Sequence, residues 1–142
     1  MFRGKLGFLS NFYSSKIVYN GRVYRTAEHL FQCCKSESES EREAVRACPT
    51  AAEARRAGRK VTLRKDWTFR RLGAMRAVLR LKFSDKYLAK KLIATGDSEL
   101  VEENTWHDDF WGVCVCKKCN GYGRNELGKA LMRIRAELQN GG

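Results

Sequence analysis

The sequence predicts an α+β fold, a mainly helical single domain packed around a small, mostly antiparallel sheet. Three observations support this class: a hairpin signal near the N-terminus, several capped helical segments after it, and a regular apolar spacing in the last helix. At 142 residues the chain is long enough to bury a core. We therefore expect one domain over residues 1–142.

The hairpin is predicted at residues 17–24. Asn20-Gly21 separates two short β-prone runs, and both central positions of a type I′ turn need the positive φ that Asn and Gly tolerate. The run from Leu6 to Phe12 is expected to add a strand, and residues 100–102 another.

Capping residues predict the helices. Thr26 caps a helix over residues 27–35, and Ser40 with Glu43 has capping-box spacing before a helix that Pro49 ends. Thr50 with Glu53 begins a third helix, which Gly58 ends. Three further helices are expected: 66–83, 85–94 with Ser84 as its cap and Thr95-Gly96 at its end, and a last one after Asn125 with Leu127, Leu131, Ile134 and Leu138 on its apolar face.

The charge of the chain points to an anionic partner. The net charge is +12, and residues 55–82 hold eleven Lys and Arg against Asp66 alone. Such a stretch attracts nucleic acid or a phosphorylated ligand, although a solvated basic helix face gives the same pattern. No apolar run approaches the ~20 residues of a membrane helix, and residues 1–5 lack a signal-peptide segment, so we expect a cytoplasmic protein.

The segment Trp106-His107-Asp108-Asp109-Phe110-Trp111-Gly112 mixes acids with aromatics. This composition suits a pocket for a flat polar ligand, such as a nucleobase joined to a ribose. Adjacent residues of an extended loop point in opposite directions, so only one of the two aspartates is expected to enter a site. A solvated turn is the alternative.

A polar stripe is expected on the helix that follows Thr26. Glu28, Gln32 and Lys35 stand at i, i+4 and i+7, on one face, and the first turn favours the anionic form of Glu28. Lys35 leans back toward the same face. The alternative is an exposed stripe with a weak ion pair.

Cys114, Cys116 and Cys119 offer three soft ligands within six residues. Zinc would need a fourth ligand, for which Cys33, Cys34, Cys48 or His107 are the candidates. Because no second pair at knuckle spacing is visible, we expect reduced thiols, no bound metal and no cofactor.

Motifs along the whole chain resemble one family. In order they are Phe8-Leu9-Ser10-Asn11-Phe12-Tyr13, Thr26-Ala27-Glu28-His29 with Phe31-Gln32 and Lys35, Gly58-Arg59 with Asp66-Trp67, Lys82-Phe83, Thr95-Gly96, Asp108 with Phe110-Trp111-Gly112, and Gly123 with Asn125 and Leu127-Gly128. Together they resemble the NADAR (YbiA-like) family from about Phe8 to Leu138. The cysteine-bearing segment between Gly112 and Gly121 departs from many members.

The resemblance implies a compact α+β fold and N-glycosidase chemistry, the cleavage of a C–N bond between ribose and a base. It implies catalytic roles for Glu28 and Asp108, and for Lys35 as a Schiff-base nucleophile. Substrate binding is implied for a further set of residues: Ser10, Asn11, Phe12, Trp67, Trp111 and Asn125.

We therefore expect a hydrolase that removes ADP-ribose from ADP-ribosylated guanine, in a nucleotide or in nucleic acid. The resemblance also implies a second substrate class, the phosphoribosylamino-pyrimidine intermediates of riboflavin synthesis. Two rivals remain: a module that holds ADP-ribose or NAD without turnover, and a plain nucleic-acid binder. No membrane partner is expected.

Overall fold

The structure is a computed structural model that describes residues 1–141. It divides into two compact units, Asn11–Lys82 (the central unit) and residues 1–10 with the chain from Phe83 onward (the terminal unit), and each is described by itself. The predicted α+β class with mainly helical content is confirmed. The predicted domain spans both units, and its last residue, Gly142, lies outside the described residues.

The central unit begins with the predicted hairpin. Strands β1 (Ser14–Tyr19) and β2 (Arg22–Thr26) pair antiparallel, with Val18 opposite Val23. Asn20 and Gly21 have φ of 50° and 74°, the positive values that the type I′ turn requires.

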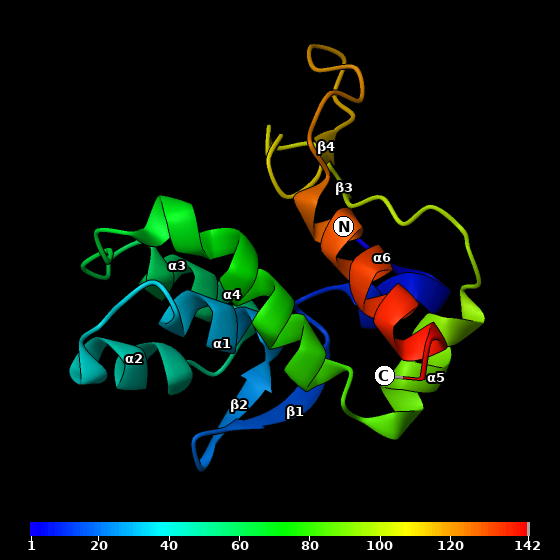
Figure 1. The fold of residues 1–142 in the computed structure, drawn as a ribbon. Helices are drawn as coiled ribbons and strands as arrows, with labels where there is room; N and C mark the ends of the chain where they lie inside the picture. Colours follow the sequence, from blue (N-terminus) through cyan, green and yellow to red (C-terminus); the bar gives the residue numbers. More distant parts are fainter. Residues whose placement is uncertain (142) are drawn as a thin grey trace. The chain divides into compact units, whose positions relative to one another are not determined.

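Four helices follow: α1 (Ala27–Cys33), α2 (Glu39–Arg46), α3 (Ala51–Gly58) and α4 (Trp67–Lys82). Helix α1 is central, because it contacts the other three helices and β2 (Figure 1). All seven of its residues are therefore buried, the polar ones included. The polar stripe of α1 is therefore buried by the surrounding helices.

The cap predictions of the central unit succeed twice and fail once. The hydroxyls of Thr26 and Thr50 accept the backbone N–H of the residue three positions on, as predicted. The prediction for Ser40 is wrong, since Ser38 caps α2 and accepts from the backbone N–H of Glu41. Both serines precede a glutamate at the same spacing, and the Glu41 carboxylate also binds Ser36 and the loop at Thr62, which favours the earlier start.

Helix α4 is the longest helix of the described residues and agrees closely with the helix expected over 66–83. Trp67, Met75 and Leu79 are buried, Leu72 is half-buried, and the basic side chain of Lys82 is buried as well. Within residues 1–141, no helix has both the length and the apolar character needed to cross a membrane.

The terminal unit contains a 3₁₀ helix η1 (Gly4–Leu9), helices α5 (Lys86–Ala94) and α6 (Glu126–Gln139), and strands β3 (Glu103–Asn104) and β4 (Val113–Cys114). The short strands β3 and β4 pair in parallel and form a sheet separate from the antiparallel hairpin. Phe8 of η1 packs edge-on against Phe83, 6.4 Å between ring centroids, and α5 contacts α6.

Three local predictions for this unit are wrong. The strand expected from Leu6 to Phe12 is largely the helical turn η1, which starts at Gly4 with φ of 58°, a conformation that glycine allows. Asp85, not Ser84, caps α5 through the N–H of Leu88. Residues 100–102 are not a strand, and the strand β3 begins directly after them, at Glu103–Asn104.

Asn125 directly precedes α6, as predicted, but does not cap it with its side chain. Its backbone is left-handed, with φ of 53°, and its amide bridges two backbone groups: Oδ1 accepts from Glu102 N, and Nδ2 donates to Leu100 O. Leu127, Leu131 and Ile134 are buried, so the apolar spacing of the helix is confirmed.

The helix α3 packs so closely on α1 that its glycine, Gly58, leaves no room for a larger residue. A Cβ at Gly58 would lie 1.9 Å from Gln32 Oε1 and 3.0 Å from Gln32 Cβ. We expect Gly58→Ala to lower the free energy of unfolding by about 1–3 kcal/mol, the usual cost of overpacking, as measured by urea denaturation. In the control Gly73→Ala on α4 the new Cβ meets nothing within 4 Å, so stability should stay the same or rise by up to about 1 kcal/mol. Equal losses would contradict the packing argument.

Candidate active site

The carboxylate of Glu28 lies at the centre of the candidate site. Its side chain is on the first turn of α1, is only 3% exposed, and its backbone N–H donates to Asn11 O at 3.0 Å. Its Oε1 accepts from Arg55 Nε at 3.1 Å and from Gln32 Nε2 at 3.4 Å. A buried carboxylate is costly without such partners, so the guanidinium stabilises the charge in place.

Arg55 was not among the predicted site residues. It projects from α3, which contacts α1, and its guanidinium also lies over the ring of Phe12, 4.5 Å from the centroid. Its side chain remains 35% exposed. In the sequence it is one arginine in a run of basic residues, and only the packing of α3 on α1 distinguishes it from its neighbours.

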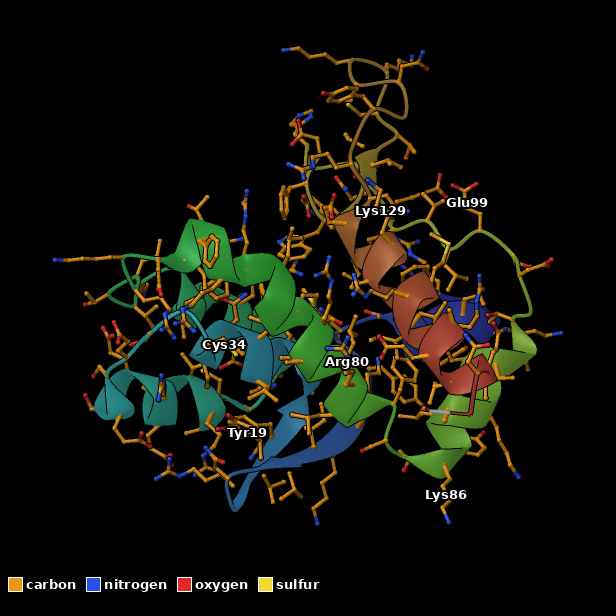
Figure 2. All side chains as sticks on the ribbon, viewed as in Figure 1. Tyr19, Cys34, Arg80, Lys86, Glu99 and Lys129 are labelled. Atoms are coloured by element: carbon orange, nitrogen blue, oxygen red, sulfur yellow. The ribbon has the colours of Figure 1, made fainter. Side chains whose placement is uncertain are left out.

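Lys35 lies close to this pair. It follows Cys34, which is labelled in Figure 2, just beyond the end of α1, and it is half-buried. Burial lowers the pKa of Lys35 below its ordinary value; Glu28 opposes that shift, whereas Arg55 and Arg59 add to it. The amine is therefore easier to deprotonate than that of an exposed lysine, which a nucleophile needs.

Two buried acceptors near Glu28 lack donors. Among the described residues, Asn11 Oδ1 and Gln32 Oε1 are buried side-chain oxygens without a hydrogen-bond partner. The amide nitrogen of Asn11 donates to Met75 Sδ, and the amide nitrogen of Gln32 donates to the Glu28 carboxylate. Orphaned buried acceptors require an explanation, and a ligand that donates hydroxyl protons supplies one. The exposed-stripe alternative for α1 is thus wrong, since Glu28 and Gln32 are interior.

The histidine beside Glu28 has a structural role. His29 is fully buried, its Nδ1 contacts Thr26 Oγ1 at 2.7 Å, and its Nε2 contacts Cys48 O at 2.9 Å. Both ring nitrogens are thereby engaged, Nδ1 at the N-cap of α1 itself and Nε2 with the segment before α3.

Trp67 is only 9% exposed and packs on Phe31, with 5.3 Å between ring centroids. It lines a cavity of about 650 Å³ whose wall does not include Glu28 or Lys35. That wall is rich in arginine and aromatic side chains: Tyr19, Arg22, Tyr24, Arg42, Arg64, Phe69 and Arg70.

A second lysine, which belongs to the Lys82-Phe83 motif but has no predicted site role, has an unusual environment. Lys82, at the end of α4, is 2% exposed, and burial lowers its pKa to about 7. Its ammonium lies 5.6 Å from the centroid of the Tyr13 ring. The central unit therefore holds two amines with lowered pKa values.

The terminal unit carries the predicted Asp108. Its Oδ1 accepts the backbone N–H of Phe110 at 3.1 Å and of Trp111 at 3.0 Å. The amide of Asn104 holds the Asp108 backbone on both sides, donating to its carbonyl and accepting from its N–H. Asp108 is half-buried and Asp109 is exposed. The expectation that only one of the two enters a site stays a prediction.

The remaining predicted residues of this unit have these surroundings. The ring of Trp111 meets Phe110 edge-on, with 4.8 Å between centroids. Ser10 is buried at the end of η1 and its N–H donates to Gly7 O. The amide of Asn125 is engaged by the backbone on both sides, as described above. The roles of these residues in ligand binding stay predictions.

A buried carboxylate paired with a partly exposed guanidinium, and acting electrostatically on an amine with lowered pKa, is typical of an enzyme that performs acid–base and amine chemistry. Comparison with known proteins identifies the family. The family described as NADAR domain matches residues 1–139, and the chain belongs to it.

Relatives and a solved structure support the same family assignment. "N-glycosidase YbiA" of Shigella boydii is 38% identical over 93% of this chain and 81% of its own length, and "N-glycosidase Npun_R5314" of Nostoc punctiforme is 36% identical over 94% and 86%. The NMR structure of E. coli YbiA matches with a TM-score of 0.83 and 34% identity, over 99% of this chain and 84% of that one. Family membership gives the enzyme class, N-glycosidase.

A "Riboflavin biosynthesis protein" of Vibrio vulnificus is 40% identical over 94% of this chain, but the match covers only 36% of that longer protein. The chain thus spans about a third of that relative, in contrast to most of YbiA.

Proposed function

We propose that the chain hydrolyses the bond between a ribose carbon and a base nitrogen, with Glu28 and Lys35 as catalytic residues. The observation that carries the proposal is the buried Glu28 carboxylate with the half-buried amine of Lys35 nearby, whose pKa is lowered by burial. A module that only binds ADP-ribose has no need of a buried charge next to a deprotonatable amine, which favours the enzyme over the reader.

The chemistry balances with water as the only co-reactant. The neutral Nζ of Lys35 adds to C1 of the ring-opened ribose, the C–N bond to the base breaks, and the base leaves with a proton. Water then hydrolyses the imine, which releases the sugar and restores the amine. Glu28 moves the protons at the departing nitrogen and at the water, and its negative charge stabilises the cationic carbon. The orphaned acceptors of Asn11 and Gln32 receive ribose hydroxyls.

For the substrate we propose ADP-ribosylated guanine, free or within nucleic acid. The eleven basic residues of segment 55–82 belong to α3, α4 and the loop between them, in the same unit as Glu28. They create a positive field suited to a diphosphate and to a nucleic acid strand.

The second candidate substrate is a phosphoribosylamino-pyrimidine. It is favoured by the names of two relatives, the Vibrio protein above and the maize "Riboflavin biosynthesis protein PYRR, chloroplastic", which is 31% identical over 93% of this chain and 23% of its own length. Both candidate substrates are anionic, so charge separates them poorly.

One product assay tests the function and separates the substrates. The chain is incubated with ADP-ribosylated guanosine, and separately with a phosphoribosylamino-pyrimidine, and the products are measured by mass spectrometry. We expect free ADP-ribose and guanosine from the first, at a kcat/KM above that for the second. Binding of both without release of a sugar would overturn the proposal in favour of a reader.

Asp108 is predicted to be a second catalytic carboxylate, and Asp108→Asn tests this with little structural damage. An asparagine Oδ1 still accepts the two N–H groups of Phe110 and Trp111, so the turn should keep its shape while the charge is lost. We expect kcat to fall at least about tenfold, with an unchanged melting temperature, if the charge stabilises a cationic transition state. Asp109→Asn, which removes an exposed charge next to it, is the control. Equal rates for both variants would remove Asp108 from the mechanism.

A further inference from the structure

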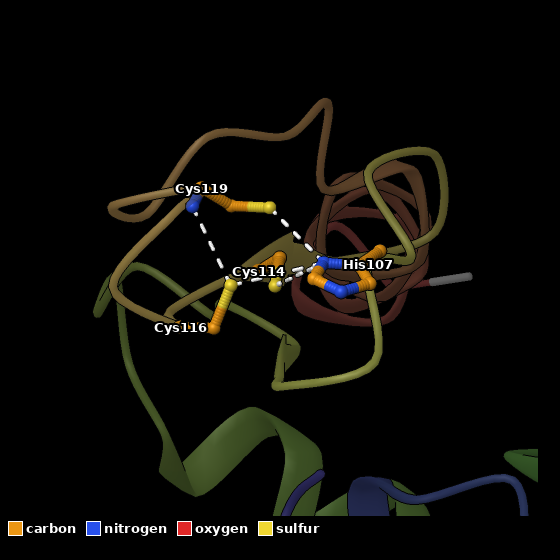
Figure 3. A group of neighbouring side chains, drawn as sticks. All are labelled: His107, Cys114, Cys116 and Cys119. Carbon is orange, nitrogen blue, oxygen red and sulfur yellow. Dashed lines mark hydrogen bonds between the residues drawn. The ribbon is translucent and has the colours of Figure 1, made fainter.

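Four side chains of the terminal unit converge on one small volume. They come from a loop before β4, from β4 itself and from the turn after it: His107, Cys114, Cys116 and Cys119 (Figure 3). One ligand atom of each residue lies within 4.8 Å of the other three. His107 Nδ1 is 3.2 Å from Cys119 Sγ and 3.7 Å from the sulfurs of Cys114 and Cys116.

The sulfur–nitrogen separations are close to the edges of a tetrahedral zinc site. Zinc–sulfur and zinc–nitrogen bonds of about 2.3 and 2.0–2.1 Å give edges of about 3.8 Å between two sulfurs and about 3.6 Å between sulfur and nitrogen. The three sulfur–nitrogen distances in the cluster scatter around that value. The widest separation in the cluster, up to 4.8 Å, would shorten by up to about 1 Å around a central ion.

The backbone holds the cluster in this arrangement. Cys114 donates to Tyr122 O and accepts from Gly121 N, which closes the loop on itself, and Asn120 N donates to Cys116 O. The N–H of Cys119 donates to Cys116 Sγ at 3.4 Å and so orients that sulfur. His107 has φ of 68°, an uncommon value for a histidine, and this conformation accompanies the direction of its ring toward the sulfurs.

We propose that His107, Cys114, Cys116 and Cys119 bind one zinc ion as a structural site. Three thiolates and one imidazole suit the borderline softness of zinc, and four protein ligands leave no coordination position for a substrate. A disulfide between two of the cysteines would leave the third thiol and the imidazole together without a function. Lys117 and Lys118, both exposed, balance the net negative charge of a zinc with three thiolates.

This proposal differs from the expectation of unligated thiols drawn from the sequence. The sequence offered four candidates for the fourth ligand, and the structure brings His107 to the three cysteines, whereas Cys33, Cys34 and Cys48 belong to the central unit. The zinc would tie the start of the loop, next to Asp108, to the turn that precedes α6. The bound zinc would therefore stabilise a segment that has little secondary structure of its own.

The test is a metal measurement on the full-length chain, purified under reducing conditions from zinc-supplied cells and dialysed against metal-free buffer. We expect about one zinc per chain by mass spectrometry of the metal, and at least about tenfold weaker zinc binding in His107→Ala and Cys119→Ser. Cys48→Ser, a cysteine outside the cluster, is the control and should retain the full content. Replacement by Co²⁺ should give the intense visible absorption of tetrahedral cobalt thiolate.

The Co²⁺ spectrum of the native chain keeps the test valid if a variant does not fold. A native chain that holds no zinc after dialysis and gives only the weak spectrum of octahedral cobalt would overturn the proposal. So would an equal loss of zinc from Cys48→Ser and Cys119→Ser. Loss of glycosidase activity plays no part in this test, so its result is independent of the proposed function.

Discussion

Replacement of Glu28 by glutamine should reduce kcat by about 10²–10⁴-fold, the range usually supplied by a positioned acid–base group. Glutamine has the same shape and still offers an oxygen to Arg55 or to the amide of Gln32, so the side chain should keep its place. It carries no negative charge and cannot take a proton. The measurement is the rate of sugar release under saturating substrate, with KM determined in the same series.

The control for this variant is Glu43→Gln. Glu43 also pairs with an arginine, Arg46, but on the exposed surface of α2, so the substitution changes net charge equally without touching the site. We expect its kcat to equal that of the native chain. If the rate of Glu28→Gln were also unchanged, Glu28 would be a structural partner of Arg55 and not a catalytic residue. A fall in kcat that tracks a fall in the folded fraction, monitored by circular dichroism, would lead to the same conclusion.

Local chemistry explains which parts of the fold were predictable. The hairpin and the caps at Thr26 and Thr50 depend on residues adjacent in sequence, and these predictions are confirmed. The cap at Ser40 failed because two serine–glutamate pairs with the same spacing compete, and contacts with distant residues decide between them. The strand expected near Leu6 failed because Gly4, with its positive φ, permits a helical turn in which Phe8 is buried against Phe83.

The candidate site was predictable in its carboxylate and amine but not in its partners. Helical spacing places Glu28 and Gln32 on one face, yet only the packing of three helices around α1 makes that face interior. The place of Arg55 in the site depends on the contact of α3 with α1, which no local sequence pattern predicts. Likewise, the proposed zinc ligand His107 stands seven positions before Cys114 in the sequence. The backbone conformation of one loop brings its ring to the sulfurs.

Lys35→Ala should lower kcat at least about 10³-fold, since it removes the group that forms the covalent bond. Lys35→Arg should be equally impaired, because it keeps the positive charge but forms no imine. The control is Lys65→Ala, which removes an exposed lysine of the same unit. Borohydride added during turnover should reduce the imine and leave one sugar adduct, which peptide mapping assigns to Lys35. An adduct on Lys82, the other buried amine, would transfer the nucleophilic role to that residue.

The pH dependence of kcat/KM gives a further test that a purely structural lysine would not pass. Only the neutral amine attacks, so kcat/KM should rise with pH through the pKa of Lys35, which burial places below the ordinary value of 10.5. Arg59 contributes to the lowering through its positive charge. Arg59→Gln should therefore raise the pKa of Lys35 and move the rising limb of the profile to higher pH, while the plateau at alkaline pH stays the same. Arg56→Gln, an exposed neighbour on α3 that does not act on this amine, is the control. A profile that Arg59→Gln leaves in place would mean that the titrating group is not the amine of Lys35.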